Sequence, residues 1–230
     1  MNRNSIKYLA AAAMLIDHIA AFLLQSESIL YMVFRTAGRL TAPIMSFFLA
    51  EGFRYTSSKK KYGIRLFLFA VISQIPYVIA NGYAILTPQF NMIFTLLLSF
   101  TILLAYENIK NSLTRTLVIC ILIATSIFSD WGIIAPLWIL TFYILQNDEK
   151  RRLIAFSVVS VMHVILCFSA VIAASKPLYS QLWQFGVFLF IPILLLYNKK
   201  SRKTSSFSKW FFYIFYPLHL AIFALLENIL

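Results

Sequence analysis

The sequence predicts an all-α integral membrane protein, a bundle of about nine transmembrane helices with its N-terminus in the cytoplasm. Of the 230 residues, 61% are hydrophobic and only 12% are charged, and the mean hydropathy is +0.82. A soluble domain is about a quarter charged and about half apolar, so a water-soluble globule is excluded. The grouping of the cations along the chain, described below, predicts the orientation.

Nine apolar stretches approach the length of a membrane-spanning helix, which is about 20 residues. They are continuously apolar rather than alternating at a period of two, which argues against a membrane β-barrel. The second is long enough to tilt or to break at Pro43, and the sixth is short and carries Pro136. The predicted spans are Ile6 to Leu24, Ile29 to Phe53, Tyr62 to Ala80, Asn91 to Tyr106, Leu113 to Ser129, Trp131 to Leu145, Leu153 to Ala173, Gln181 to Tyr197, and Trp210 to Ile229.

The cations gather in alternate connections between these spans, which indicates membrane topology rather than nucleic-acid binding. On one side lie 17 of the 20 Lys and Arg residues, and the positive-inside rule assigns that side to the cytoplasm. The exceptions are Arg35, Arg39 and Lys176. The cytoplasmic cations are Arg3, Lys7, Arg54, Lys59, Lys60, Lys61, Arg65, Lys110, Arg115, Lys150, Arg151, Arg152, Lys199, Lys200, Arg202, Lys203 and Lys209.

No connection is long enough to form a soluble domain, so residues 1–230 are expected to be a single polytopic transmembrane domain. The only low-complexity segment is the Ser/Lys linker from Asn198 to Ser208. Cys120 and Cys167 both lie in apolar runs and form neither a disulfide framework nor a metal-binding motif. Any chemistry is therefore expected inside the membrane, without a metal.

Polar side chains fall at similar predicted depths in five of the spans. With a rise of about 1.5 Å per residue, His18, Arg39, Gln74, His163 and His219 all lie near mid-membrane. Ionisable groups at this depth are costly, which makes the layer a candidate functional site. The alternative is that each histidine is an interhelical hydrogen-bonding residue.

Asp17 and His18 are adjacent and therefore diverge by about 100° around the first helix. One is expected to face the site while the other anchors a neighbouring helix. His18 is the better general base, because the pKa of imidazole is near neutral. Asp17 is then a charge partner for Arg39 or for an imidazolium.

Three polar residues at the span ends each allow two interpretations. Glu51 is either a site residue or an interfacial acid that caps a helix or pairs with Arg54 or Arg65. Asp130 and Asn91 are either site residues or helix N-caps.

The last span concentrates aromatic residues around Pro217. Proline leaves the carbonyl of Tyr213 without its helical donor, one turn before His219. The pattern predicts a broken helix beside a buried histidine, forming the wall of a site. No paired-histidine zinc helix, nucleophile elbow or phosphate-binding loop is present, which leaves general-base chemistry on a small activated group or proton-coupled transport.

Motifs spread over nearly the whole chain resemble one known family. They are Lys7-Tyr8-Leu9-Ala10, Met14-Leu15-Ile16-Asp17-His18-Ile19, Gly38-Arg39-Leu40-Thr41-Ala42-Pro43, Phe47-Phe48-Leu49-Ala50-Glu51-Gly52-Phe53-Arg54-Tyr55-Thr56, Tyr62 to Leu66, Ser73-Gln74-Ile75-Pro76, Phe90-Asn91, Ser129-Asp130-Trp131-Gly132, and Phe212-Tyr213-Ile214-Phe215-Tyr216-Pro217-Leu218-His219-Leu220. Together they resemble the TraX family of conjugal-transfer proteins.

The resemblance implies acetylation of the N-terminal amine of pilin subunits at the bacterial plasma (inner) membrane. That family is similar to acyltransferase family three, which takes acetyl-CoA from the cytoplasm and uses a first-span histidine preceded by a basic residue. Lys7, which precedes His18 with ten residues between them, stands where the relatives commonly carry arginine.

The sequence and the resemblance together predict an acetyltransferase that uses acetyl-CoA as co-substrate and acts on an amine or hydroxyl of a peptide, pilin or cell-envelope molecule. Alternatives are a proton-coupled transporter with a relay of His18, His163 and His219, and an assembly or chaperone subunit without chemistry. The predicted catalytic residues are His18, Asp17, Arg39 and His219. The predicted residues for binding acetyl-CoA are Lys7, Glu51, Arg54, Tyr55, Lys59, Lys60, Lys61, Arg65, Gln74, Asn91 and Tyr216.

Overall fold

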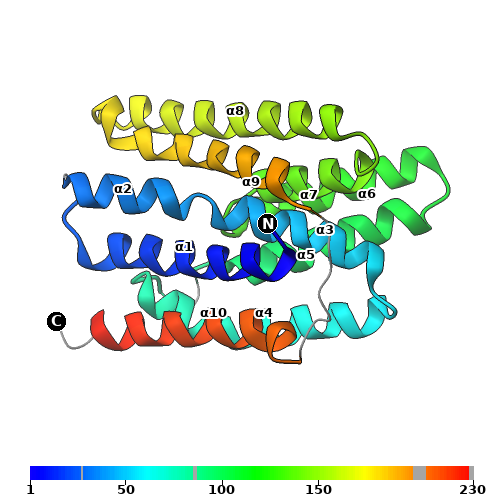
Figure 1. The fold of residues 1–230 in the computed structure, drawn as a ribbon, viewed down its shortest axis with the longest axis horizontal. Helices are drawn as coiled ribbons and strands as arrows, with labels where there is room; N and C mark the ends of the chain where they lie inside the picture. Colours follow the sequence, from blue (N-terminus) through cyan, green and yellow to red (C-terminus); the bar gives the residue numbers. More distant parts are fainter. Residues whose placement is uncertain (27, 85–86, 199–205, 228–230) are drawn as a thin grey trace. The chain divides into compact units, whose positions relative to one another are not determined.

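The computed structural model describes residues 1–26, 28–84, 87–198 and 206–227, and of 206–209 and 227 only the backbone (Figure 1). Most of these residues are helical, which confirms the predicted all-α class; the β structure in this part of the chain is one isolated bridge, between Phe90 and Ser129. The linker cations Lys199, Lys200, Arg202 and Lys203, and the side chain of Lys209, lie outside the description.

The chain divides into two compact units. Unit 1 comprises Met1–Met45 and Ser157–Phe215, and unit 2 comprises Ser46–Phe156 and Tyr216–Leu230. The chain passes from one unit to the other within helices α3 (Thr41–Tyr55), α8 (Glu149–Ala173) and α10 (Ser206–Glu227).

In unit 1, α1 (Arg3–Leu23) packs against α2 (Ile29–Gly38), and α2 packs against the 3₁₀ helix η2 (Leu178–Leu189). Alanines form much of the buried face of α1, which lets a neighbouring helix approach closely. α9 (Phe190–Leu196) follows η2, and the backbone N–H of Asn198 donates to the carbonyl of Met1 at 3.1 Å. The N-terminus therefore lies beside the end of α9, in agreement with the prediction that both face the same side.

The predicted second span is two helices, because the chain breaks at Arg39 and Leu40, where α2 gives way to α3. Pro43 explains the position of the break. Its ring would clash with the carbonyl of residue 39, four positions earlier, in a continuous helix, whereas proline is tolerated in the first turn of α3. The break predicted at Pro43 thus occurs one turn earlier.

The predicted eighth span is mostly a 3₁₀ helix, which sequence analysis did not predict. η2 extends over 12 residues, although 3₁₀ runs longer than three or four residues are uncommon. Its period of three residues aligns Ser180, Trp183 and Gly186 on one face and Gln181 and Gln184 on the next. This alignment determines which side chains of η2 reach the candidate site.

Unit 2 is built around α5 (Met92–Asn108), which packs against α4 (Lys59–Ala80), α6 (Ser112–Thr125) and α7 (Ile134–Ile144). Its core is aromatic: Trp138 and Phe156 have no exposed surface, and their ring centroids lie 5.5 Å apart. α6 ends in a short 3₁₀ turn, η1 (Ser126–Phe128).

Two boundaries in unit 2 differ from the sequence-based prediction. α7 begins at Ile134 rather than at Trp131, because Trp131 and Gly132 adopt φ values of 64° and 41° and form a turn. The predicted break at Pro217 is wrong, since α10 continues through this proline. A proline removes one backbone donor from a membrane helix without having to end it.

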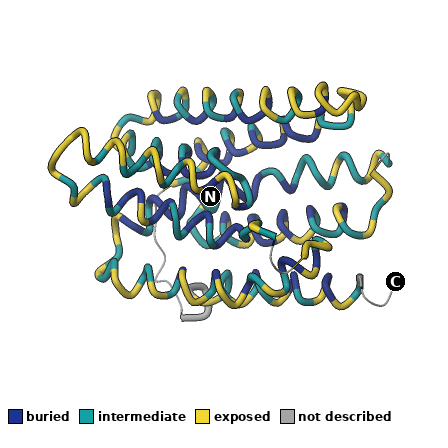
Figure 2. The backbone as a smooth tube through the Cα atoms, turned by 180° about the vertical axis from the view of Figure 1, so that it is seen from behind, coloured by how far each residue is buried: buried dark blue, intermediate teal, exposed yellow. Residues whose placement is uncertain are grey.

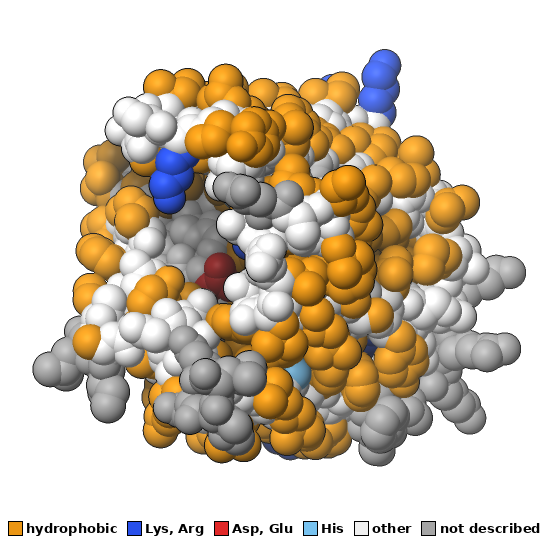
Figure 3. Space-filling view, turned by 90° about the vertical axis from the view of Figure 1, so that its left-hand side faces the viewer, with side chains coloured by type: hydrophobic (Ala, Val, Ile, Leu, Met, Phe, Trp, Pro, Cys, Tyr) orange, Lys and Arg blue, Asp and Glu red, His pale blue; other side chains and the backbone are white. Residues whose placement is uncertain are grey.

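Hydrophobic side chains on the outside of the helices account for the high hydropathy. α1, α4, α8 and the continuous segment Leu178–Leu196 are each long and apolar enough to cross a membrane, and shorter apolar helices accompany them. Exposed residues recur along the helices (Figure 2), and hydrophobic side chains dominate the face in Figure 3. On α8, Val158, Ile165 and Ile172 are 63%, 58% and 64% exposed. Such an apolar surface is the pattern of a multi-pass membrane protein.

Candidate functional site

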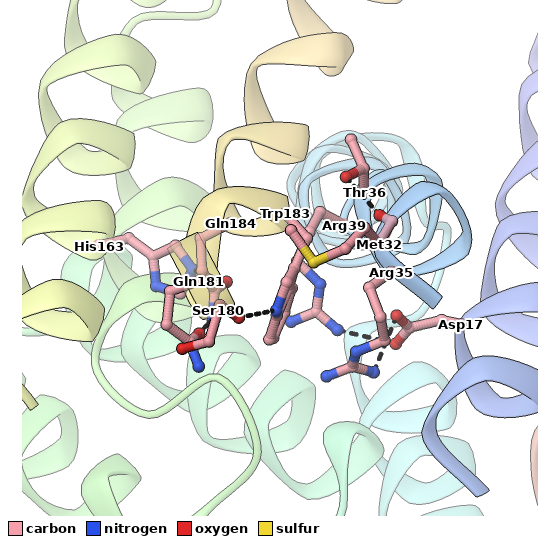
Figure 4. Close-up of polar contacts among 10 residues, drawn as sticks. All are labelled: Asp17, Met32, Arg35, Thr36, Arg39, His163, Ser180, Gln181, Trp183 and Gln184. Atoms are coloured by element: carbon pink, nitrogen blue, oxygen red, sulfur yellow. Dashed lines mark hydrogen bonds and ion pairs between the residues drawn. The ribbon is translucent and has the colours of Figure 1, made fainter. Parts of the chain in front are cut away.

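A carboxylate in unit 1 is held by two arginines (Figure 4). Asp17 of α1 lies 2.9 Å from Nη1 of Arg35 through Oδ1, and its Oδ2 accepts a hydrogen bond from Nη2 of Arg39 at 2.7 Å. The three side chains are 11–15% exposed. The contact between Asp17 and Arg39 agrees with the predicted role of Asp17 as a charge partner.

Gly38 allows this contact to form. A Cβ atom at position 38 would lie 2.3 Å from both Cβ and Oδ1 of Asp17, closer than any real Cβ contact. The last residue of α2 is therefore a glycine because the Asp17 side chain occupies the space of a side chain there. This close approach places the carboxylate beside Arg35 of α2 and Arg39, the residue that follows α2.

Trp183 of η2 lies against both guanidinium groups. The Cζ atoms of Arg35 and Arg39 are 4.2 Å and 4.7 Å from the centroid of the Trp183 ring, within the range of cation–π attraction. The indole N–H donates to the carbonyl of Ser180 at 2.7 Å, which fixes the ring. We call Asp17, Arg35, Arg39 and Trp183 the Asp17 cluster.

Gly186, one 3₁₀ turn after Trp183, brings η2 against α2. A Cβ at position 186 would lie 2.0 Å from the backbone oxygen of Thr36 and 3.0 Å from Cβ of Arg39. The cluster is thus assembled by two glycine contacts, one on each side of α2. Such packing limits the freedom of both arginines.

The Asp17 cluster has a net charge of +1, since two guanidinium charges face one carboxylate. Arginine keeps its charge even in a poorly hydrated site. A partly buried excess charge is unfavourable unless a further group compensates it. The cluster is therefore suited to a single negative charge, either on a ligand or developing during a reaction.

His163 lies in unit 1 within a row of amides that starts at its ring (Figure 4). Its Nε2 is 3.0 Å from Oε1 of Gln184, and Nε2 of Gln184 donates to Oε1 of Gln181 at 3.1 Å. Sγ of Cys167, one turn along α8, is 3.8 Å from Nδ1 of His163. This environment is that of an interhelical hydrogen-bonding histidine, the alternative that the sequence left open.

His18 lies on α1 next to Asp17 but in a different environment. It is half-buried, and its ring stacks on Phe22 with centroids 5.6 Å apart and an interplanar angle of 8°. The predicted divergence of the two neighbours is confirmed, since Asp17 faces α2 while His18 stacks along its own helix.

Gln74 and Asn91 meet in unit 2, where they fix the start of α5. Oδ1 of Asn91 accepts from the backbone N–H of Ile93 and Phe94, so Asn91 is the N-cap. Its Nδ2 donates to Oε1 of Gln74 and to the carbonyl of Ala70, both at 2.8 Å. Of the two interpretations of Asn91, capping is confirmed.

Tyr216 and His219 lie together in the part of α10 that belongs to unit 2. Both are 3% exposed, and their ring centroids are 5.5 Å apart. The hydroxyl of Tyr216 accepts from the backbone N–H of Met92 at 3.1 Å, so Tyr216 and Asn91 both bind the N-terminal end of α5. Of the five residues of the predicted mid-membrane layer, His18, Arg39 and His163 thus lie in unit 1, and Gln74 and His219 lie in unit 2.

The connections that follow α3, α5 and α7 lie at one end of unit 2. Glu107 forms an ion pair with Lys59 and accepts a hydrogen bond from the hydroxyl of Tyr143, and Arg54 donates to Oε1 of Gln146. Burial disfavours the Glu107 carboxylate, but Lys59 and Tyr143 outweigh it and lower the pKa of Glu107. The cations of these three connections therefore share one end, as the predicted topology requires.

Other basic residues at this end of unit 2 differ in their exposure and in their contacts with aromatic rings. Lys60 and Lys61 are exposed, and the guanidinium of Arg65 lies 5.5 Å from the centroid of the Tyr62 ring. Tyr55 is 68% exposed, beneath the Arg54 guanidinium at 5.4 Å. These residues form a basic, aromatic surface at one end of unit 2.

Three predicted residues remain to be placed. Lys7 is half-buried on α1, and Glu51 of α3 interacts electrostatically with Arg152. The interpretation of Asp130 as an N-cap is wrong, because Ile133 occupies that position before α7.

Sequence analysis missed four members of the groups in unit 1: Arg35, Trp183, Gln181 and Gln184. Arg35 lies one turn before Arg39 in an apolar span, a spacing that could have identified it. Trp183 and Gln184 depend on the 3₁₀ geometry of η2, which the apolar sequence does not reveal.

Comparisons with known proteins identify the family of the chain. The chain is 29% identical to the probable fimbrial assembly protein FimC, serogroup H1, of Dichelobacter nodosus, over 96% of each chain. No solved structure matches the chain. The family model described as "TraX protein" matches residues 2–227, and the protein therefore belongs to the TraX family.

Proposed function

We propose that this protein is a membrane-embedded acetyltransferase, which moves an acetyl group from cytoplasmic acetyl-CoA to an amine or hydroxyl acceptor. Membership of the TraX family, which is associated with pilin N-acetylation, supports this proposal, as does the fimbrial name of its relative. We take the N-terminal amine of a pilin or another exported peptide as the acceptor class. The structural observation that carries the proposal is the Asp17 cluster, with its excess positive charge.

The cluster matches the electrostatic demand of acyl transfer. When an amine attacks the thioester carbonyl, the carbonyl oxygen gains a full negative charge in the tetrahedral intermediate. Donors that are already held in place stabilise such an oxyanion most strongly. Arg39, with Arg35 beside it, supplies these donors, while Asp17 and Trp183 hold both guanidinium groups.

His18 is the proposed general base, which removes a proton from the attacking amine or hydroxyl. Asp17 is poorly suited to that task, because protonating it would break its contacts with two arginines. The half-buried imidazole of His18 can take the proton without breaking those contacts. His219 is the second proposed catalytic histidine, and Tyr216, Gln74 and Asn91 are proposed to contact the acetyl donor.

The phosphates of acetyl-CoA are proposed to bind the basic end of unit 2. Lys59 and Arg54 already contact Glu107 and Gln146, so the exposed Lys60 and Lys61 are the first candidates for the phosphates, with Arg65 next. Tyr55 offers an exposed ring for the adenine, and Lys7 and Glu51 are further candidates. Long-range attraction between this surface and the polyanion should weaken with added salt.

The test is transfer of labelled acetyl from acetyl-CoA, by the purified full-length protein in lipid nanodiscs, to a peptide with a free N-terminal amine. Label is expected on this peptide and not on the same peptide with a blocked terminus. No transfer to any amine or hydroxyl acceptor would overturn the proposal. Uptake of protons coupled to a solute, without transfer, would support the transporter instead.

A variant of Arg39 sharpens this test. Arg39→Lys keeps the charge but loses the planar donor geometry, and removal of one oxyanion donor slows such reactions about 10²–10³-fold. We therefore expect Arg39→Lys to lower kcat by about 10²–10³-fold, while its thermal unfolding midpoint stays close to that of wild type. Wild-type turnover would instead assign Arg39 to structural pairing with Asp17.

A further inference from the structure

The two arginines of the Asp17 cluster share one carboxylate in an unusual way. Asp17 contacts Arg35 and Arg39 through different oxygens, each with a single terminal nitrogen. A full arginine–carboxylate pair uses two parallel N–H donors of one guanidinium, which adds strength and geometric specificity. Neither arginine forms that two-donor arrangement with Asp17.

Arg35 offers a further donor. Asp17 takes Nη1 of Arg35, and the buried Nε of Arg35 has no hydrogen-bond partner among the described residues. A buried N–H without a partner is costly, so this donor favours an acceptor. The natural partner for one edge of a guanidinium is a second carboxylate.

The charge and the accessibility of the cluster fit such a ligand. Two guanidinium groups and one carboxylate leave +1, which one monoanion would compensate. The side chain of Arg35 is 15% exposed and that of Asp17 is 12% exposed, so the cluster is not sealed. Trp183 and Gly186 hold the arginines from the side of η2, so they need little reordering when a ligand binds.

We propose that the Asp17 cluster binds one carboxylate group, with Arg35 as its principal donor. The carboxylate is either free acetate, the hydrolysis product of the acetyl donor, or an acidic group that the acyl acceptor carries beside its amine. This choice of sources rests on the proposed acetyltransferase function, whereas the binding itself does not.

Binding is tested first without acetyl-CoA. The thermal unfolding midpoint of the full-length protein in nanodiscs is measured with increasing sodium acetate, with its neutral isostere acetamide, and with sodium chloride at equal ionic strength. We expect acetate to raise the midpoint in a saturable manner and acetamide and chloride to have no such effect. Equal effects of acetate and either control would overturn the proposal.

Variants identify the donor. Arg35→Gln is expected to weaken acetate binding about tenfold or more, because it removes one charged partner of a poorly hydrated pair. Lys176→Gln, which removes an exposed cation of the same unit, is the matched control and should leave acetate binding unchanged. If Arg35→Gln does not fold, Arg35→Lys keeps the charge and should bind acetate more weakly than wild type. Unchanged binding in the folded Arg35 variant would contradict the proposal.

Kinetics then distinguish the two sources. If the ligand is free acetate, acetate inhibits transfer competitively with acetyl-CoA. If the acceptor carries it, a peptide with Glu beside the reactive amine has a lower KM than its Gln counterpart, and Arg35→Gln abolishes the difference. If neither of these two effects is observed, the proposed link between the carboxylate site and the reaction is overturned. Acetate binding without acetyl transfer would overturn the proposed acetyltransferase function but support the carboxylate site. Acetyl transfer without acetate binding would support the proposed function but overturn the carboxylate site.

Discussion

At the scale of single residues, the Asp17 cluster combines what a sequence can and cannot predict. An aspartate and an arginine in neighbouring apolar spans must find partners, so their pairing could be predicted and is confirmed. The contact of Trp183 with the two arginines could not be predicted, because it depends on the 3₁₀ conformation of η2. The close approach of neighbouring atoms to Gly38 and Gly186 could not be predicted either, because it depends on how the helices pack.

These glycines give the first prediction. Gly38→Ala would force a methyl group against Asp17, and Gly186→Ala would force one against the Thr36 carbonyl, so each should lower the free energy of unfolding by about 1–3 kcal/mol. Gly63→Ala is the control, because its added Cβ meets only the ring edge of Phe100 at 3.1 Å. Thermal unfolding of the three variants checks this expectation. A control as unstable as the other two would mean that loss of glycine alone causes the effect.

At the scale of elements, hydropathy predicted where helices lie better than how they are built. The helical stretches α1, α4, α5 and α8 largely coincide with predicted spans because a continuous apolar run of that length is almost always a helix. The 3₁₀ form of η2 escaped prediction, since a segment that is apolar on most sides carries little signal that distinguishes a period of three from one of 3.6. The short 3₁₀ turn η1 escaped for the same reason.

The N-caps of α5 and α6 give the second prediction. Both are asparagines, but Asn91 is fully buried and bonded to Gln74 and Ala70, whereas Asn111 is exposed and its Oδ1 accepts from the backbone N–H of Thr114. Asn91→Ala loses a cap, about 0.5–2 kcal/mol, and the two buried hydrogen bonds of its Nδ2, about 0.5–1.5 kcal/mol each. Asn111→Ala should lose only the cap. Equal losses of thermal stability would contradict the importance of the buried network.

At the scale of the whole molecule, the predicted topology rests on the cations. The structure places the connections after α3, α5 and α7 at one end of unit 2, and the N-terminus beside the end of α9 in unit 1. Each unit separately agrees with alternation of the connections between two sides. Which side is cytoplasmic is a prediction from the positive-inside rule.

Cysteine labelling tests that prediction. After both native free thiols, Cys120 and Cys167, are replaced by alanine, single cysteines are introduced as Ser57→Cys and Ser175→Cys, both at exposed positions. An impermeant reagent should label position 175 in intact cells and position 57 only after the membrane is opened. Labelling of position 57 from outside would invert the topology and remove the cytoplasmic route for acetyl-CoA.

The most direct test of the account compares the rate of acetyl transfer by wild type and by His18→Ala, at saturating acetyl-CoA and peptide. A general base contributes about 10²–10⁴-fold, so kcat should fall by that factor, while the thermal unfolding midpoint stays close to that of wild type because His18 is only half-buried. His163→Ala, which removes a buried histidine that the proposed chemistry does not use, should retain transfer wherever the variant is folded. A His18→Ala protein that transfers acetyl at more than a few per cent of the wild-type rate would contradict the account.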